Sequence, residues 1–116
     1  MKRIRLVHWN QNEAQEKISL LRTTSYEVDY ELPKAPALLR ELQEAPPQLI
    51  VIDLSRLPSQ GRDIGLLLRK FKSTRAVPLI FVDGENEKVT RIKALLPDAV
   101  YITWDRIGDA MTQAVT

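Results

Sequence analysis

Short apolar runs alternate with amphipathic segments along the whole chain. The apolar runs are short, rich in β-branched residues and bounded by Pro, Gly or polar residues, which predicts strands over 3–8, 26–31, 48–53, 77–82 and 99–103. Between the runs, apolar residues recur at spacings of three and four, and each such segment presents one apolar stripe. This pattern predicts helices over 11–23, 35–44, 61–73, 86–96 and 105–115.

The regular alternation of strand and helix predicts an α/β protein with a parallel sheet and helices on both of its faces. Right-handed crossovers favour a doubly wound, three-layer α/β/α sandwich with five strands in the order 2-1-3-4-5, the flavodoxin-like arrangement. The run 26–31 alternates Tyr26, Val28 and Tyr30 with polar residues. Such alternation is typical of a half-exposed strand, so we expect this run at an edge of the sheet.

The chain has 116 residues and no internal repeat, so we predict one domain over residues 1–116. Its 44% apolar and 28% charged residues are ordinary for a globular protein, and no run approaches the ~18 apolar residues of a membrane span. The absence of Cys and of a signal-peptide pattern leads us to expect a cytoplasmic protein. The net charge of +2 forms no basic stripe, so we expect neither direct nucleic-acid binding nor membrane binding.

Asp53 is the best candidate for chemistry, because it ends the fully apolar run and would lie at the carboxyl edge of the sheet. Ligands of open parallel sheets bind at that edge. Two interpretations stay open from the residues. Asp53 is either a structural carboxylate, capped by backbone amides or paired with Arg56 or Arg62, or a functional group that serves as a switch or ligand contact.

The stretch 49–69 resembles the receiver domain of response regulators in two-component systems. In that family a strand-end Asp is followed by a Pro-containing loop and a Gly before the third helix, as Asp53, Pro58 and Gly61 are here. Two later runs are similar to the fourth and fifth strands of the family: 77–82 and 98–104. The resemblance implies a receiver fold, Asp53 as the equivalent of the phosphoacceptor, and a phosphorelay that uses Mg²⁺.

The groups that support this chemistry in the family are replaced in this chain. His8-Trp9 replaces the acidic pair after strand one. Asp83 replaces the hydroxyl residue after strand four, and Trp104 replaces the Lys after strand five. A phosphoryl group on a carboxylate needs cations and donors already in place. Asp83 instead adds a like charge, and an indole offers one neutral N–H. We therefore expect no Mg²⁺-dependent phosphorylation of Asp53.

These observations predict a degenerate receiver, or pseudo-receiver, that acts in signal transduction through protein–protein contacts, catalyses no reaction and holds no cofactor. Two alternatives stay open. The first is an atypical receiver that is still phosphorylated at Asp53, with Asp53 and Asp83 as weak metal-ligand candidates. The second is a small-ligand-binding module in which Trp9 and Trp104 form aromatic walls. We expect a protein partner, a fused effector or kinase domain, or a second copy bound at the strand-five face.

Two groups of residues carry these expectations. The crevice around Asp53 is predicted to contain His8, Trp9, Asn10, Asp83 and Trp104. The partner face is predicted to contain Val89, Arg91, Tyr101 and Arg106. Tyr101 stands where the resemblance implies the strand-five aromatic that moves between buried and exposed positions.

Overall fold

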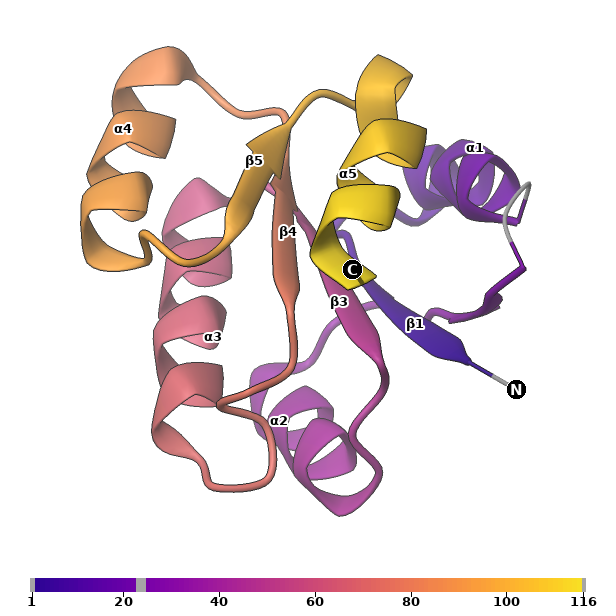
Figure 1. The fold of residues 1–116 in the computed structure, drawn as a ribbon, viewed down its shortest axis with the longest axis vertical. Helices are drawn as coiled ribbons and strands as arrows, with labels where there is room; N and C mark the ends of the chain where they lie inside the picture. Colours follow the sequence, from indigo (N-terminus) through magenta and orange to yellow (C-terminus); the bar gives the residue numbers. More distant parts are fainter. Residues whose placement is uncertain (1, 23–24, 116) are drawn as a thin grey trace.

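The predicted architecture is confirmed by the computed structural model, which describes residues 2–22 and 25–115 (Figure 1). Five parallel strands form one sheet in the order β2-β1-β3-β4-β5. The strands are β1 (Arg3–Val7), β2 (Glu27–Asp29), β3 (Leu49–Asp53), β4 (Leu79–Val82) and β5 (Val100–Ile102). The helices are α1 (Gln11–Leu21), α2 (Ala35–Glu44), α3 (Pro58–Lys70), α4 (Asn86–Leu95), the short 3₁₀ helix η1 (Trp104–Arg106) and α5 (Ile107–Val115).

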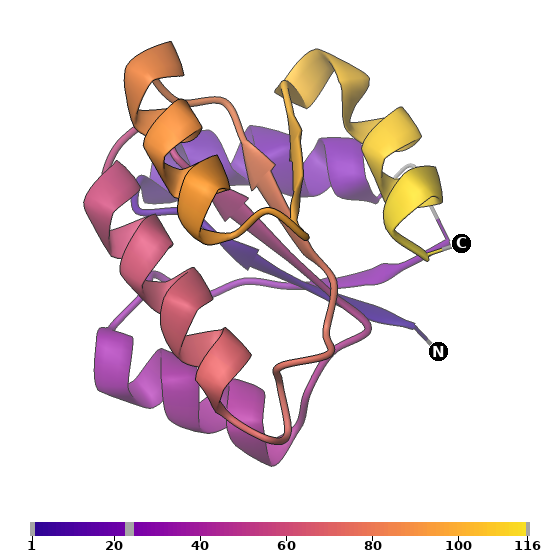
Figure 2. The same cartoon turned by 60° about the vertical axis from the view of Figure 1, so that its left-hand side comes forward.

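Strands β1, β3 and β4 bury their side chains on both faces of the sheet, as the apolar runs require, whereas the edge strands β2 and β5 are only partly buried. On one face Leu6 and Val51 pack with α1 and α5, and on the other Ile52 and Phe81 pack with α2, α3 and α4. Figure 2 shows these helices on the two sides of the sheet. Because β3 is the middle strand of the sheet, its last residue, the buried Asp53, lies at the centre of the carboxyl edge.

Several element boundaries differ from the predicted ones for local reasons. Helix α3 begins at Pro58 instead of residue 61, because the fixed backbone angle of Pro suits the first helical position. Strands β2 and β5 keep only three residues each at the two edges of the sheet. The 3₁₀ turn at Trp104 precedes α5 and was not predicted. Helix α1 ends at Leu21, and its predicted end at residue 23 lies outside the described residues.

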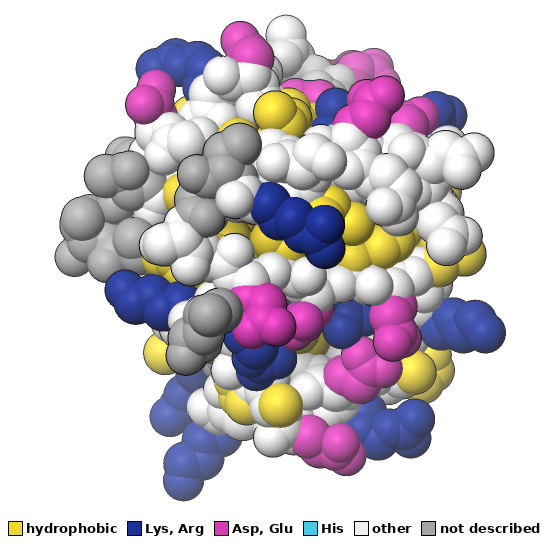
Figure 3. Space-filling model, turned by 90° about the vertical axis from the view of Figure 1, so that its right-hand side faces the viewer, with side chains coloured by type: hydrophobic (Ala, Val, Ile, Leu, Met, Phe, Trp, Pro, Cys, Tyr) yellow, Lys and Arg dark blue, Asp and Glu magenta, His cyan; other side chains and the backbone are white. Residues whose placement is uncertain are grey.

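The surface carries both signs of charge. On the face shown in Figure 3, Lys and Arg side chains are interspersed with Asp and Glu side chains around hydrophobic ones, without a basic stripe. Within residues 2–22 and 25–115, no helix has the length and hydrophobicity that crossing a membrane would need.

Candidate functional site

Asp53 ends β3 almost completely buried, with 1% of its surface exposed. Its Oδ1 accepts hydrogen bonds from the Ser55 backbone N–H at 2.8 Å and from the Ser55 hydroxyl. Its Oδ2 accepts from the indole N–H of Trp104 at 2.7 Å. The Ser55 contacts form an Asx-type turn, in which an Asp side chain binds the backbone two residues further on. Donors of the chain itself therefore satisfy both oxygens of this buried carboxylate.

His8 lies directly beside Asp53 and is fully buried. Its Nδ1 accepts a hydrogen bond from the Asn10 backbone N–H at 3.1 Å, which places a ring proton on Nε2. Nε2 is 3.5 Å from Asp53 Oδ2 and 3.9 Å from Glu13 Oε1, and it completes no hydrogen bond with the described residues. His8 thus places its Nε2 between two carboxylates, where the family resemblance implies an acidic side chain.

Trp104 links Asp53 to two other elements. Its ring packs in the core between the sheet and helices α1 and α5, with 5% of the residue exposed. The ammonium of Lys17 on α1 lies 5.5 Å from the ring centroid, within the range of a cation–π contact. The backbone N–H of Trp104 donates to Asp83 Oδ1 at 3.2 Å. One residue at the start of η1 therefore contacts β3, α1 and the turn after β4.

An ion pair between α1 and the β3–α3 loop lies on the solvent side of His8. Arg56 Nε donates to Glu13 Oε1 at 3.3 Å, and Arg56 Nη2 donates to Oε2. The hydrogen bond from Arg56 holds the pKa of Glu13 below its usual value, and the Glu13 carboxylate raises the pKa of Arg56. Asp53 also raises the pKa of Arg56, by a smaller amount. The guanidinium thus supplies positive charge near two carboxylates.

The residues around Asp53 do not fit a Mg²⁺ site. No group of three or more His, Asp or Glu side chains within residues 2–22 and 25–115 has an arrangement that could hold a metal ion. Asp53 is bound to Ser55 and Trp104, whereas Asp83 points to the Trp104 backbone from a turn in which both it and Gly84 have positive φ. Mg²⁺ binds proteins through one or two carboxylates and several waters, and both oxygens of the buried Asp53 already accept hydrogen bonds from the chain.

The five residues predicted to surround Asp53 are only partly brought together. His8 and Trp104 lie next to Asp53. The backbone of Asn10 binds His8 instead of Asp53, and the Asn10 side chain caps α1. Trp9 packs on the opposite face of the sheet from Trp104, with the α2–α4 core. The structure therefore does not bring the two indoles to one crevice. His8 points to the face of Asp53 and Trp104, and Trp9, the next residue, points to the opposite face.

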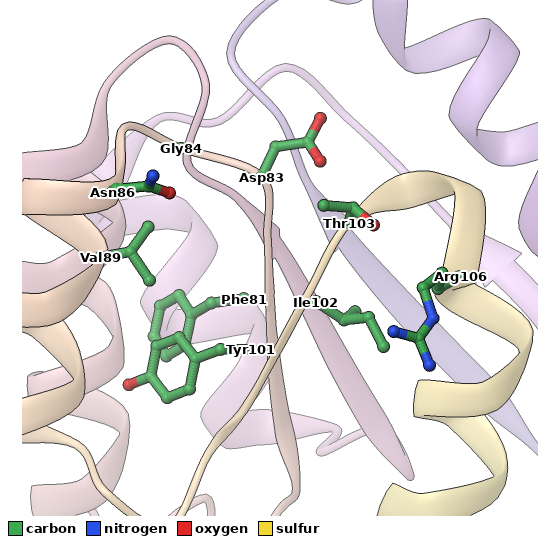
Figure 4. A pocket seen from close by; sticks show the side chains of 9 residues that line it. All are labelled: Phe81, Asp83, Gly84, Asn86, Val89, Tyr101, Ile102, Thr103 and Arg106. Atoms are coloured by element: carbon green, nitrogen blue, oxygen red, sulfur yellow. The ribbon is translucent and has the colours of Figure 1, made fainter.

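Three of the four residues predicted for the partner face lie around a cavity of about 330 Å³ next to β5 (Figure 4). Val89, Tyr101 and Arg106 line it, together with Asp83 and Thr103. Figure 4 shows these side chains coming from the turn after β4, from α4, from β5 and from the segment 103–106 that leads into α5.

Arg91 does not lie on this face. It is two positions after Val89 on α4, and a step of two residues turns a side chain away from its neighbour on a helix. Its guanidinium binds Glu87 of the same helix at 2.9 Å, and it lines a different groove, next to α3. The structure thus separates Arg91 from Val89, Tyr101 and Arg106, and its part in a partner contact stays a prediction.

Tyr101 is half-buried and packs against the core. Its ring stacks on Phe81 with centroids 5.3 Å apart and 13° between the planes, and its hydroxyl donates to the Leu96 carbonyl at 2.7 Å. Burial raises the pKa of Tyr101 to about 12. The aromatic side chain therefore forms the floor of the cavity and joins β5 to the end of α4.

Sequence reasoning missed three residues of the site: Glu13, Lys17 and the hydroxyl of Ser55. The order Asp53-Leu54-Ser55 is a local signal for an Asx-type turn and could have identified Ser55. Glu13 and Lys17 gave no such signal, because their side chains meet His8 and Trp104 only after α1 packs on the sheet.

No known protein family matches the sequence, and no curated protein matches it either. Solved structures do match the fold. The chain is similar to the chemotaxis protein CheY4 of Vibrio cholerae, with a TM-score of 0.79 and 14% identity over 98% of each chain. It is also similar to the signal receiver domain of a signal transduction histidine kinase from Syntrophus aciditrophicus, with a TM-score of 0.77 and 19% identity over 99% of this chain and 90% of that one.

A third similar structure is the Mn²⁺-bound form of the response regulator Rcp1, with a TM-score of 0.70 and 21% identity over 99% of this chain and 90% of that one. The fold of the chain is thus that of receiver domains.

Proposed function

We propose that this chain is a receiver-like signalling module that acts through protein contacts without Mg²⁺-dependent phosphorylation of Asp53. One observation carries the proposal: Asp53 is buried, and Ser55 and Trp104 satisfy both of its oxygens. A phosphoryl transfer to Asp53 would have to break these hydrogen bonds in a buried site. It would also add negative charge close to Glu13, where Arg56 is the nearest ion-pairing cation.

The receiver fold supports the signalling part of the proposal. The similar structures are a chemotaxis protein, a receiver domain of a histidine kinase and a Mn²⁺-bound response regulator. The site of this chain differs from a metal-binding one, because the described residues provide no cluster of metal ligands. We infer that the hydrogen-bond network fixes the module in one state, and that binding of a partner replaces phosphorylation as its signal.

The cavity lined by Val89, Tyr101 and Arg106 is the surface that we assign to the protein partner or to a second copy of the chain. It combines apolar side chains with Asp83 and Arg106, a mixture typical of specific, reversible interfaces. The Trp104 backbone links this surface to Asp53, since its N–H binds Asp83 on the cavity wall.

Treatment with acetyl phosphate and Mg²⁺, followed by intact-mass measurement, tests the chemical part of the proposal. We expect no species heavier by about 80 Da, while an Mn²⁺-binding response regulator treated in parallel becomes modified. A heavier species that disappears in Asp53→Asn would establish the atypical phosphorylated receiver instead.

Site-specific photo-crosslinking in the cell that produces the protein tests the contact part. A crosslinking amino acid at Val89, on the cavity, is compared with one at Glu16, on the exposed surface of α1. We expect a discrete covalent adduct from position 89 and none from position 16. Adducts of equal yield at both positions would contradict a partner surface at the cavity.

A further inference from the structure

A second groove, lined by basic side chains, lies between α3 and α4, which pack side by side (Figure 2). It encloses about 90 Å³. Its lining contains three basic side chains and no carboxylate. The lining residues are Pro58, Ser59, Arg62, Lys88, Arg91 and Ile92. The groove lies on the other side of α4 from the cavity of Figure 4, since Val89 faces that cavity and Arg91 faces this groove.

The basic side chains of the groove are available to a ligand. Arg62 pairs with Asp63 at 3.0 Å and Arg91 pairs with Glu87 at 2.9 Å, and both pairs join neighbours on one helix and are exposed. Exposed ion pairs of this kind contribute little to stability, so a ligand carboxylate can take the place of Asp63 or Glu87. Lys88 forms no ion pair with any residue that the structure describes.

An exposed apolar side chain continues the groove along α4. Leu95 is 54% exposed, the largest value among the exposed large hydrophobic residues of the described chain. It follows Arg91 by four positions and Lys88 by seven, so the three side chains share one face of the helix. Ile92 lies between them, buried in the floor of the groove. The surface therefore presents cations at one end and an apolar contact at the other.

We propose that the α3–α4 groove binds an acidic, amphipathic segment of a protein partner. The carboxylates of such a segment would form ion pairs with Arg62, Lys88 and Arg91. Its apolar side chains would pack against Leu95. The groove lining has no aromatic side chain on which a nucleic-acid base would stack. This surface is separate from Asp53 and from the cavity next to β5, so the proposal goes beyond the function proposed above and stands or fails independently of it.

Fluorescence anisotropy with a labelled model peptide of repeated Glu-Glu-Leu units, about 12 residues long, tests the proposal on the whole chain. We expect binding that weakens about fivefold between roughly 50 and 300 mM NaCl, because exposed charges are screened. Lys88→Glu should weaken binding about fivefold at the lower salt. Leu95→Ala should weaken it by the same factor at both salt concentrations, since apolar contact is not screened.

Lys93→Glu is the matched control, because it makes the same charge change on α4 while Lys93 lies over the Tyr101 ring on the other side of the helix. It should change the affinity less than twofold. Arg91→Glu gives a second measurement on the groove if Lys88→Glu does not fold by circular dichroism. An equal effect of Lys93→Glu, equal binding of the peptide with Gln in place of Glu, or displacement by an oligothymidylate at the same concentration would overturn the proposal.

Discussion

The indole of Trp104 contributes a hydrogen bond that Phe could not replace. Trp104→Phe keeps an aromatic ring in the core but removes the N–H that binds Asp53 Oδ2. A buried carboxylate oxygen that loses its donor costs about 1–3 kcal/mol. We expect the free energy of unfolding to fall by that amount in urea titrations followed by circular dichroism.

A double-mutant cycle separates this hydrogen bond from the lost ring volume. Trp104→Phe, Asp53→Asn and the double variant are compared, and we expect a coupling energy of about 1 kcal/mol or more. Trp9→Phe serves as the control, because Trp9 packs on the face of the sheet that α2, α3 and α4 cover and makes no hydrogen bond to Asp53. A coupling energy near zero would show that Trp104 acts only by filling space.

Glu13 gives a pH-dependent prediction at the residue scale. Arg56 holds the pKa of Glu13 below its usual value in the folded state. A carboxyl with a lowered folded pKa stabilises the fold above the pKa of the unfolded chain, about 4.3, and loses this contribution as pH falls further. We expect Glu13→Gln to be less stable than the natural chain at pH 6, and this difference to shrink as pH falls below about 4.3, in urea titrations at low salt. A difference that stays constant as the pH is lowered would contradict the assignment to the Arg56 pair.

The site was predictable to the extent that it depends on strand ends. Asp53, His8 and Trp104 follow apolar runs, and parallel strands bring their carboxyl ends to one edge of the sheet. The direction of each side chain was not predictable in the same way. Asp83 turns away because a positive φ re-aims the chain there. The strand alternation, applied to His8 and Trp9, could have placed Trp9 on the face opposite His8.

At the scale of elements, the turn between β4 and α4 depends on Gly84. Its φ is +98°, and a Cβ there would lie 2.9 Å from Leu54 Cβ and 3.0 Å from Val89 Cγ2. Both the backbone strain and the contacts oppose a side chain. We expect Gly84→Ala to lower the free energy of unfolding by about 1–3 kcal/mol.

Gly108 in α5 provides the matched control, because a Cβ built there meets no atom within 4 Å. Gly108→Ala should leave the stability unchanged or raise it by up to about 1 kcal/mol, since Ala is the better helix former. Denaturant midpoints of both variants check the pair of predictions. A loss of stability in Gly108→Ala as large as that in Gly84→Ala would show that the turn geometry is not the cause.

Element type was well predicted from the sequence, whereas element ends were not. Buried strands such as β3 are marked by continuous apolar residues, and helices by their stripes. The short β2 and β5 depend on pairing at the two edges of the sheet, which no local pattern encodes. The 3₁₀ turn at Trp104 depends on two hydrogen bonds: the indole N–H donates to Asp53, and the backbone N–H donates to Asp83.

At the scale of the whole molecule, the site near Asp53 predicts how the fold responds to metal ions. A ligand that binds only the folded state, present at a hundred times its Kd, adds about 2.7 kcal/mol to the stability. For a domain of this size that raises Tm by several degrees. Because the described residues offer no metal-ligand cluster, we expect about 10 mM Mg²⁺ or Mn²⁺ to shift Tm by less than about 1 °C relative to EDTA. A shift of several degrees that is lost in Asp53→Asn, with Asp63→Asn on the exposed side of α3 as the control, would show that Asp53 exchanges its hydrogen bonds for a metal ion.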